Sequence, residues 1–283
     1  MSDRLDVRKT YKLLVNGAFP RSESGRSYEV TSPEGAFIAN VAQASRKDLR
    51  DAVVAARSGQ VTWWELSAYN RAQVMYRWAE MAESRRTELA EIVGLSQGLT
   101  TNDAHRSAAR AVDRIVWYAG WCDKVSQVLG GANAVAGPFF NFSLPVPSGV
   151  VGVIAPQESS LEGFVDAVCA PLCVGNSVVA LTSERRPLAA VVLAEMSATS
   201  DFPAGVLNVL TGLTQELGVH LATHEDVDGI DVTGAGERGD ELARLATGSI
   251  KRVYRGRVDD DTNPLRRLRA FIETSTVWHT IGQ

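Results

Sequence analysis

The chain has 283 residues, of which 45% are hydrophobic and 22% charged, so it has enough apolar material for one large globular domain or two smaller ones. Its 29 basic and 33 acidic residues give a formal charge of −4 without a long run of one sign, which argues against a nucleic-acid or anionic-membrane partner. No apolar stretch reaches the roughly 18 residues of a membrane helix, and the N-terminus lacks the apolar core of a signal peptide. We therefore expect neither secretion nor membrane insertion.

The first part of the chain predicts a small sheet followed by helices. Residues 11–45 alternate short β-rich pieces with turn residues, which is typical of a small antiparallel sheet. Ser45 is placed to cap a helix that runs through about Arg57. Apolar side chains at helical spacing then predict helices over 68–93 and 103–128.

From residue 148 the pattern changes to short apolar runs that alternate with helical stretches. The runs are GVVGVIAP, NSVVALTS, GVLNVLTG and VDGIDVTG, and we expect helices near 160–173, 187–199, 214–223 and 238–247. This alternation predicts an α/β fold with a doubly wound parallel sheet of the dinucleotide-binding type. Such sheets bind ligands at the carboxyl ends of their strands. We therefore expect one crevice among Pro156–Ser160, Thr182–Arg186, Thr211–Gly212 and Thr233–Gly239.

These stretches resemble, in order, the aldehyde dehydrogenase superfamily, from roughly Leu13 to Val253. The matching segments are VNGAF, GVVGVIAP, GNSVVALTSERRPL, DFPAGVLNVLTG, HEDVDGIDVTGAGERG and ATGSIKRV. The family oxidises aldehydes with NAD or NADP: a cysteine thiolate attacks the carbonyl, and hydride leaves to the nicotinamide. The resemblance implies a Rossmann-like cofactor domain.

The loop after the first strand of this domain departs from the family. In the family's APWNFP, the asparagine supplies a donor to the oxyanion hole. Here the loop reads APQESS, and Glu158 stands in the place of that asparagine. An ionised carboxylate donates no hydrogen bond and repels a developing negative charge, so the resemblance implies a loop unsuited to the reaction.

The cofactor-binding motifs are also altered. In the family's KPSE, the lysine and the glutamate grip the adenosine ribose; here Leu181 replaces the lysine, and of these two residues only the glutamate is retained, as Glu184. The turn TGAGERG resembles the family's TGSTEVG, which keeps Thr233, Gly234 and Gly239 as further vestigial cofactor-binding candidates. This turn either meets an anion at a helix N-terminus or needs glycine for packing alone. The resemblance implies that NAD(P) binds weakly or not at all.

No catalytic or metal-binding residues are expected. After Val253 the chain lacks the family's LELGGKSP segment, with its general-base glutamate, and the catalytic domain with its nucleophilic cysteine. The three cysteines do not replace that nucleophile, because one lies on an amphipathic helix and two flank a core helix; we assign Cys122, Cys169 and Cys173 to packing. Their odd number indicates a reducing compartment, so we expect a cytoplasmic location.

His220 and His224 have the spacing of metal ligands on a helix. We expect that helix to end near Thr223, and no nearby Cys or second carboxylate completes a site, so we predict no metal there.

The C-terminal segment FIETSTVWHTIGQ resembles the strand with which one family subunit pairs with the catalytic domain of its neighbour. We expect strand 273–281 to be a free edge that needs a partner. The domain organisation that we expect begins with an N-terminal β-rich oligomerisation segment (11–45) and a helical part (46–147). The Rossmann-like domain (148–253) follows. A solvated linker (254–267) then takes the place of the catalytic domain, and an oligomerisation strand (268–283) ends the chain.

Three functions agree with these observations. The first is an inactive subunit, a pseudoenzyme, that assembles with a full-length aldehyde dehydrogenase and stabilises or regulates it. The second is an NAD(P)-binding module without turnover, and the third is a subunit whose missing catalytic residues come from the partner chain. The missing nucleophile disfavours independent activity and Leu181 disfavours the second, so we favour the first. We expect a hetero-oligomer, because two copies of this chain both lack the domain that accepts the tail.

Overall fold

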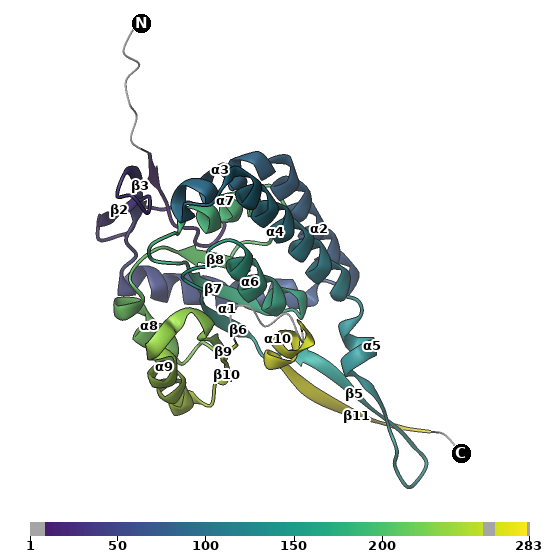
Figure 1. Ribbon diagram of the computed structural model, residues 1–283. Helices are drawn as coiled ribbons and strands as arrows, with labels where there is room; N and C mark the ends of the chain where they lie inside the picture. The colour runs from purple at the N-terminus through teal and green to yellow at the C-terminus, as the bar shows by residue number, and fades with distance from the viewer. Residues whose placement is uncertain (1–8, 257–263, 282–283) are drawn as a thin grey trace, which may run out of the picture.

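The computed structural model describes residues 9–256 and 264–281. Its centre is a five-stranded parallel sheet with the strand order β10-β9-β6-β7-β8. The strands are β6 (Val150–Ile154), β7 (Ser177–Leu181), β8 (Leu207–Leu210), β9 (Gly229–Asp231) and β10 (Arg252–Tyr254). Helices cover both faces, which confirms the predicted doubly wound α/β architecture (Figure 1).

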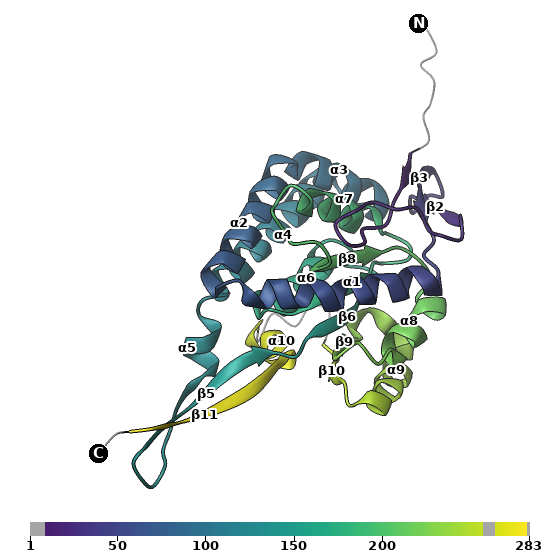
Figure 2. The same cartoon turned by 180° about the vertical axis from the view of Figure 1, so that it is seen from behind.

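The two faces of this sheet separate the helices into two layers. Val151 and Val153 of β6 pack into a core with the helices α2, α3, α4, α6 and α7. Val150 and Ile154 of the same strand pack into a second core with α1, α8 and α9. Successive side chains of a strand point to opposite faces, so the continuous apolar runs seen in the sequence serve both layers. Figure 2 shows α1 lying across the second face.

The helices after the central strands lie close to their predicted places. They are α6 (Glu162–Cys173), α7 (Leu188–Ser197), α8 (Thr214–Thr223) and α9 (Gly239–Ala246). None of the described helices is both long enough and apolar enough to span a bilayer.

The N-terminal helices begin where expected but differ in length. α1 (Arg46–Glu65) starts with a capping box, in which the Ser45 side chain accepts from the backbone and Asp48 accepts from the Ser45 N–H. It continues well beyond the predicted end at Arg57. The single helix predicted over 68–93 is divided into α2 (Ala68–Ser84) and α3 (Arg86–Gln97), and the one predicted over 103–128 into α4 (Thr101–Trp121) and α5 (Val125–Leu129).

A small sheet precedes these helices, with the order β1-β3-β2. Its strands are β1 (Thr10–Tyr11), β2 (Ser27–Thr31) and β3 (Phe37–Ala42). β2 and β3 are antiparallel as predicted, whereas β1 pairs with β3 in parallel, so the sheet is mixed. Leu14 and Val209 exchange two backbone hydrogen bonds of 2.9 and 2.8 Å, which joins this segment to the edge strand β8 of the central sheet.

A third sheet forms an arm that projects from the body (Figure 1). It consists of β4 (Gly131–Asn133), β5 (Phe139–Pro147) and β11 (Ile272–Thr280), in the order β11-β5-β4. Residues 131–147, which the sequence placed with the helical part, are therefore largely strand. The expectation that the tail strand is unpaired is wrong for one of its edges, because β11 pairs with β5 of the same chain along its whole length.

The segment before the tail strand is not a solvated linker throughout, which corrects that prediction for residues 264–267; residues 268–270, assigned to the tail strand, are helical as well. This stretch forms α10 (Pro264–Ala270), and both Leu268 and the following Phe271 are fully buried. The Phe271 ring leaves no room for a side chain at Gly229 in β9, since a Cβ there would lie 2.9 Å from the ring. The acidic cluster Asp259–Asp261 lies outside the described residues.

An ion pair fixes α10 to the central sheet. Nη1 of Arg267 lies 2.8 Å from Oδ2 of Asp231 in β9, and neither side chain is more than 10% exposed. The guanidinium also lies 4.8 Å from the centroid of the Tyr254 ring in β10. α10 is thus held beside β9 and β10 of the central sheet.

Candidate functional site

The loops at the carboxyl ends of β6 and β7 meet, as the sequence predicted. The side-chain oxygen of Gln157 accepts from the backbone N–H of Glu184 at 2.9 Å. The Ser183 hydroxyl donates to the backbone oxygen of Gln157 at 3.0 Å. These bonds connect the two loops across the crevice in which relatives of this fold bind a nucleotide.

Glu158 is held at the outer side of the same crevice. Its carboxylate forms an ion pair with Arg186, from the loop after β7, although the Glu158 side chain itself is 72% exposed. The side chain offers acceptors only, so it cannot stabilise an oxyanion. That this loop is unsuited to aldehyde chemistry stays a prediction from the sequence.

A cavity of about 610 Å³ lies between the loop that carries Glu158 and helix α4. Its walls contain an ion pair, in which Nε of Arg110 lies 2.8 Å from Glu162. The Ser107 hydroxyl donates to the same carboxylate at 2.7 Å. These charged groups satisfy one another, and the cavity lining includes no cysteine.

Leu181 and Glu184 face different surroundings. Leu181 is 2% exposed and belongs to the core between the sheet and α1, α8 and α9, so it presents no cation to a ribose. The retained Glu184 accepts a hydrogen bond from the backbone N–H of Thr214, the first residue of α8. That helix begins after Leu213, which has no side chain able to cap it, so Glu184 supplies the missing acceptor. The carboxylate therefore has a structural partner within the chain.

The turn Thr233–Gly239 supports the packing interpretation at Gly234. A Cβ at this position would lie 1.9 Å from the backbone oxygen of Ala155, so only glycine allows the turn to approach the end of β6 this closely. Thr233 donates its backbone N–H to Asp231 at 2.9 Å, and its hydroxyl accepts from the N–H of Gly256 at 3.1 Å. Residues Thr233–Arg238 form a 3-10 helix that precedes α9, and α9 itself starts at Gly239.

Arg238 bridges the beginnings of α8 and α9. It donates to the backbone oxygen of Gln215 at 3.2 Å and forms a bidentate pair with Glu241. The hydrogen bond from Arg238 lowers the pKa of the Glu241 carboxyl below its ordinary value. The loops after β6, β7 and β9 are thus connected to neighbouring elements by side chains of the chain itself.

The cysteines occupy the core, as predicted. All three are buried and free, and burial raises the pKa of Cys169 and Cys173 well above that of an ordinary thiol. Neutral, enclosed thiols are poor nucleophiles.

α8 ends at Thr223, and Nδ1 of His224 accepts from the N–H of Asp226 at 3.2 Å. Within residues 9–256 and 264–281, no three His, Cys, Asp or Glu side chains are grouped as metal ligands.

Sequence reasoning missed the pair of Asp231 and Arg267. Burial raises the pKa of the Asp231 carboxyl, against the opposing effects of Arg267 and of the hydrogen bond from Thr233. An aspartate inside the otherwise apolar strand GIDV was the signal that could have revealed a buried partner.

Comparisons with known proteins agree with this geometry. A model of the aldehyde dehydrogenase family matches residues 19–255. The chain is 35% identical to the putative aldehyde dehydrogenase DhaS of Bacillus subtilis over 251 residues, which are 87% of this chain and 50% of that protein. It is 33% identical to the mitochondrial benzaldehyde dehydrogenase of Antirrhinum majus over 242 residues, 84% of this chain and 45% of that one.

Solved structures give the same result. The NAD+ complex of an aldehyde dehydrogenase from Bacillus cereus superposes with a TM-score of 0.82 at 29% identity, over 87% of this chain and 50% of that one. HpcC from Thermus thermophilus gives 0.84 at 27% identity, over 88% and 48%. The chain spans about half the length of the relatives it matches. It belongs to the aldehyde dehydrogenase family.

Proposed function

We propose that the chain is a catalytically inactive subunit that assembles with a full-length aldehyde dehydrogenase and stabilises or regulates it, in the cytoplasm. The observation that carries this proposal is the outer edge of β11, which has no neighbouring strand among the described residues. A strand edge of this kind is a template for pairing with another sheet.

The proline positions in β5 reveal which backbone groups of β11 face outward. Pro145 and Pro147 have no N–H, so they sit where β5 forms no bond to β11, opposite Thr274 and Ile272. The N–H of Ile281 donates to the oxygen of Pro138 at 2.9 Å, which places the odd-numbered residues toward β5. Antiparallel pairing alternates, so the even-numbered residues point their N–H and C=O groups away. These are Ile272, Thr274, Thr276, Trp278 and Thr280.

The side chains of the arm also favour association. Trp278 is 61% exposed and meets Phe139 edge-on at a centroid distance of 5.8 Å. On the other face, Phe140 and Val277 are exposed. Exposed aromatic residues on a projecting ribbon are typical of an interaction surface. β11 contains no proline, lysine or arginine, residues with which edge strands are commonly protected.

A pair of proline variants tests this function. Thr276→Pro removes an outward N–H and leaves the backbone bonds between β5 and β11 intact, with the loss of one 3.4 Å side-chain bond to Ser143, whereas Val277→Pro removes an inward backbone bond. We expect Thr276→Pro to fold normally and to lose co-purification with a co-expressed full-length aldehyde dehydrogenase from the same organism. Equal recovery of the partner by the wild-type chain and by Thr276→Pro, with both folded by circular dichroism, contradicts the proposal. Failure of the wild-type chain to recover any such partner contradicts it as well.

A second candidate is a cofactor-binding module, favoured by the likeness to a structure that contains NAD+. The missing lysine at Leu181 and the engaged Glu184 argue against it. A hydrogen bond to a charged group contributes roughly 1.5–3 kcal/mol, so we expect affinity for NAD or NADP to be weak. Titration calorimetry that finds low-micromolar binding would favour this module instead.

A further inference from the structure

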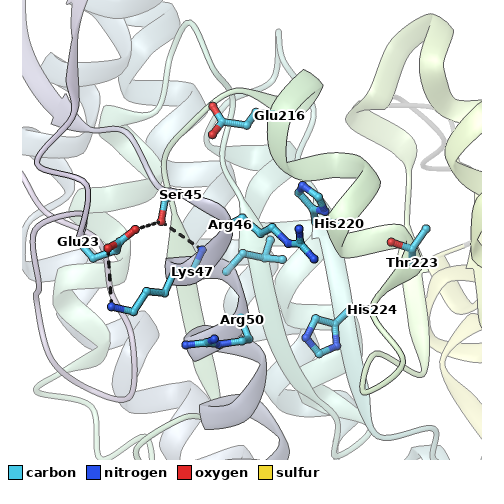
Figure 3. Close-up of a pocket in the computed structure, with 10 residues that line it drawn as sticks. Glu23, Ser45, Arg46, Lys47, Arg50, Glu216, His220, Thr223 and His224 are labelled. Carbon is cyan, nitrogen blue, oxygen red and sulfur yellow. Dashed lines mark hydrogen bonds and ion pairs between the residues drawn. The ribbon is translucent and has the colours of Figure 1, made fainter.

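A cavity of about 650 Å³ lies between the start of α1 and α8. Figure 3 shows side chains from both helices around it. α1 contributes Arg46, Lys47 and Arg50, α8 contributes His220, and His224 follows the last residue of α8. The lining is therefore rich in groups that are cationic or that can become so.

The two carboxylates of the lining are already neutralised by other groups. Glu216 accepts two bonds from Arg26, at 2.7 and 3.2 Å. The bond from Arg26 lowers the pKa of Glu216, so this carboxylate is ionised and paired. Glu23 accepts from the Ser45 hydroxyl at 2.9 Å and lies 3.7 Å from Nζ of Lys47.

The arginines, in contrast, have donors to spare. Arg46 has no ion pair with any other residue in the described part of the chain, and Figure 3 shows it reaching from α1 toward His220 on α8. Arg50 pairs at 2.9 Å with its sequence neighbour Asp51, and both side chains are at least half exposed. Such exposed pairs are weak. A guanidinium offers its donors in a fork that fits the oxygens of phosphate or carboxylate.

We propose that this cavity binds a small oxyanion with two or more negative charges, of phosphate or polycarboxylate chemistry, held by Arg46 and Arg50 on one wall and His220 on the other. The α1 helix has 20 residues and starts at this cavity, so the positive end of its dipole adds to the attraction. The site is separate from the β11 edge and does not rest on the proposed function.

Titration calorimetry of the full chain tests this site, with pyrophosphate, ATP, inorganic phosphate and citrate as probes at constant ionic strength. We expect saturable one-to-one binding of at least one probe. Preference for pyrophosphate and ATP over citrate identifies phosphate chemistry, and the reverse identifies polycarboxylates.

The double variant Arg46→Ala/Arg50→Ala should bind at least about tenfold more weakly, since two charge-assisted hydrogen bonds are lost. Arg86→Ala is the matched control, because Arg86 is an exposed arginine on α3 whose one ion pair among the described residues is with its surface neighbour Glu83, at 2.8 Å. Binding by this control should equal that of the wild-type chain. The proposal is overturned if no probe binds the wild-type chain, or if the double variant and the control bind equally.

Discussion

The strand-end loops of the central sheet differ from β5 and β11 of the arm in whether their polar groups form hydrogen bonds within the chain. In the loops, Gln157, Glu184 and Arg238 bond to neighbouring loops and helix ends of the same chain. In the arm, Thr274, Thr276, Trp278 and Thr280 turn their backbone groups away from the molecule. The region where relatives of this fold bind a nucleotide is thus internally connected, while the projecting strand has bonding capacity left. This difference is the reason for proposing assembly rather than catalysis.

The largest expected effect concerns the attachment of α10 to the central sheet. Arg267→Leu removes the partner of a fully buried carboxylate, Asp231, and we expect a loss of about 3–5 kcal/mol in the free energy of unfolding. The double variant Asp231→Val/Arg267→Leu should recover most of that loss, because it leaves no unpaired charge. Urea denaturation of both variants measures this; a double variant no more stable than the single one contradicts the account.

The same variant has a pH dependence of known sign. Burial raises the pKa of Asp231 in the folded state, and the loss of Arg267 removes an opposing effect. A carboxyl whose folded pKa is raised favours the folded state below its unfolded pKa of about 3.9 and loses this contribution as pH rises through the folded value. The deficit of Arg267→Leu relative to the wild-type chain should therefore shrink on acidification. A deficit that grows on acidification would contradict the assignment of Asp231 as the buried partner.

A smaller but substantial effect is expected in the strand-end loops. Gly234→Ala places a Cβ against the backbone of Ala155, and we expect a cost of roughly 1–3 kcal/mol or more from overpacking. Gly248→Ala is the control, since a Cβ at Gly248 meets no atom within 4 Å. Thermal unfolding compares the two. Equal stabilities would show that close approach is not what requires Gly234.

The smallest effect on stability is expected at the outer side of the crevice. Glu158→Asn breaks an ion pair whose acid is largely exposed, so stability should change by no more than about 1 kcal/mol. The substitution restores the family's amide, but no thiol is exposed in the described residues to attack an aldehyde. Neither the variant nor the wild-type chain should reduce NAD or NADP with an aldehyde. Turnover that persists after removal of contaminating dehydrogenases would refute the inactive assignment.

Local features of this fold could be predicted from the sequence. The apolar runs of β6 to β9 are buried on both faces, and that pattern needs no distant information. Ser45 with Asp48 marks the start of α1 for the same reason. The division between α2 and α3 at Arg85 could not be foreseen, because neither glycine nor proline marks it.

The other differences between the sequence-based predictions and the structure involve residues that are far apart in the sequence. β5 and β11 pair although more than a hundred residues separate them. The β5 sequence SLPVP contains no local pattern that predicts which strand it pairs with. Arg267 was assigned to a linker because its charged neighbours suggest solvent, yet its side chain is buried beside Asp231. At the site, the sequence indicated which family residues were missing, but not that Gln157 and Glu184 bond within the chain. Tertiary structure selects such partners, and local patterns do not specify them.

Hydrogen exchange at single residues of β11, measured by NMR with and without a full-length aldehyde dehydrogenase, tests the central claim most directly. In the free chain, the amides of Ser275, Val277 and His279 should exchange slowly, and those of Thr276 and Trp278 rapidly. Addition of the partner should slow exchange at Thr276 and Trp278 to the level of their odd-numbered neighbours. Unchanged rapid exchange at these two amides, in a sample where the complex has formed, would show that the β11 edge is not where this chain meets its partner.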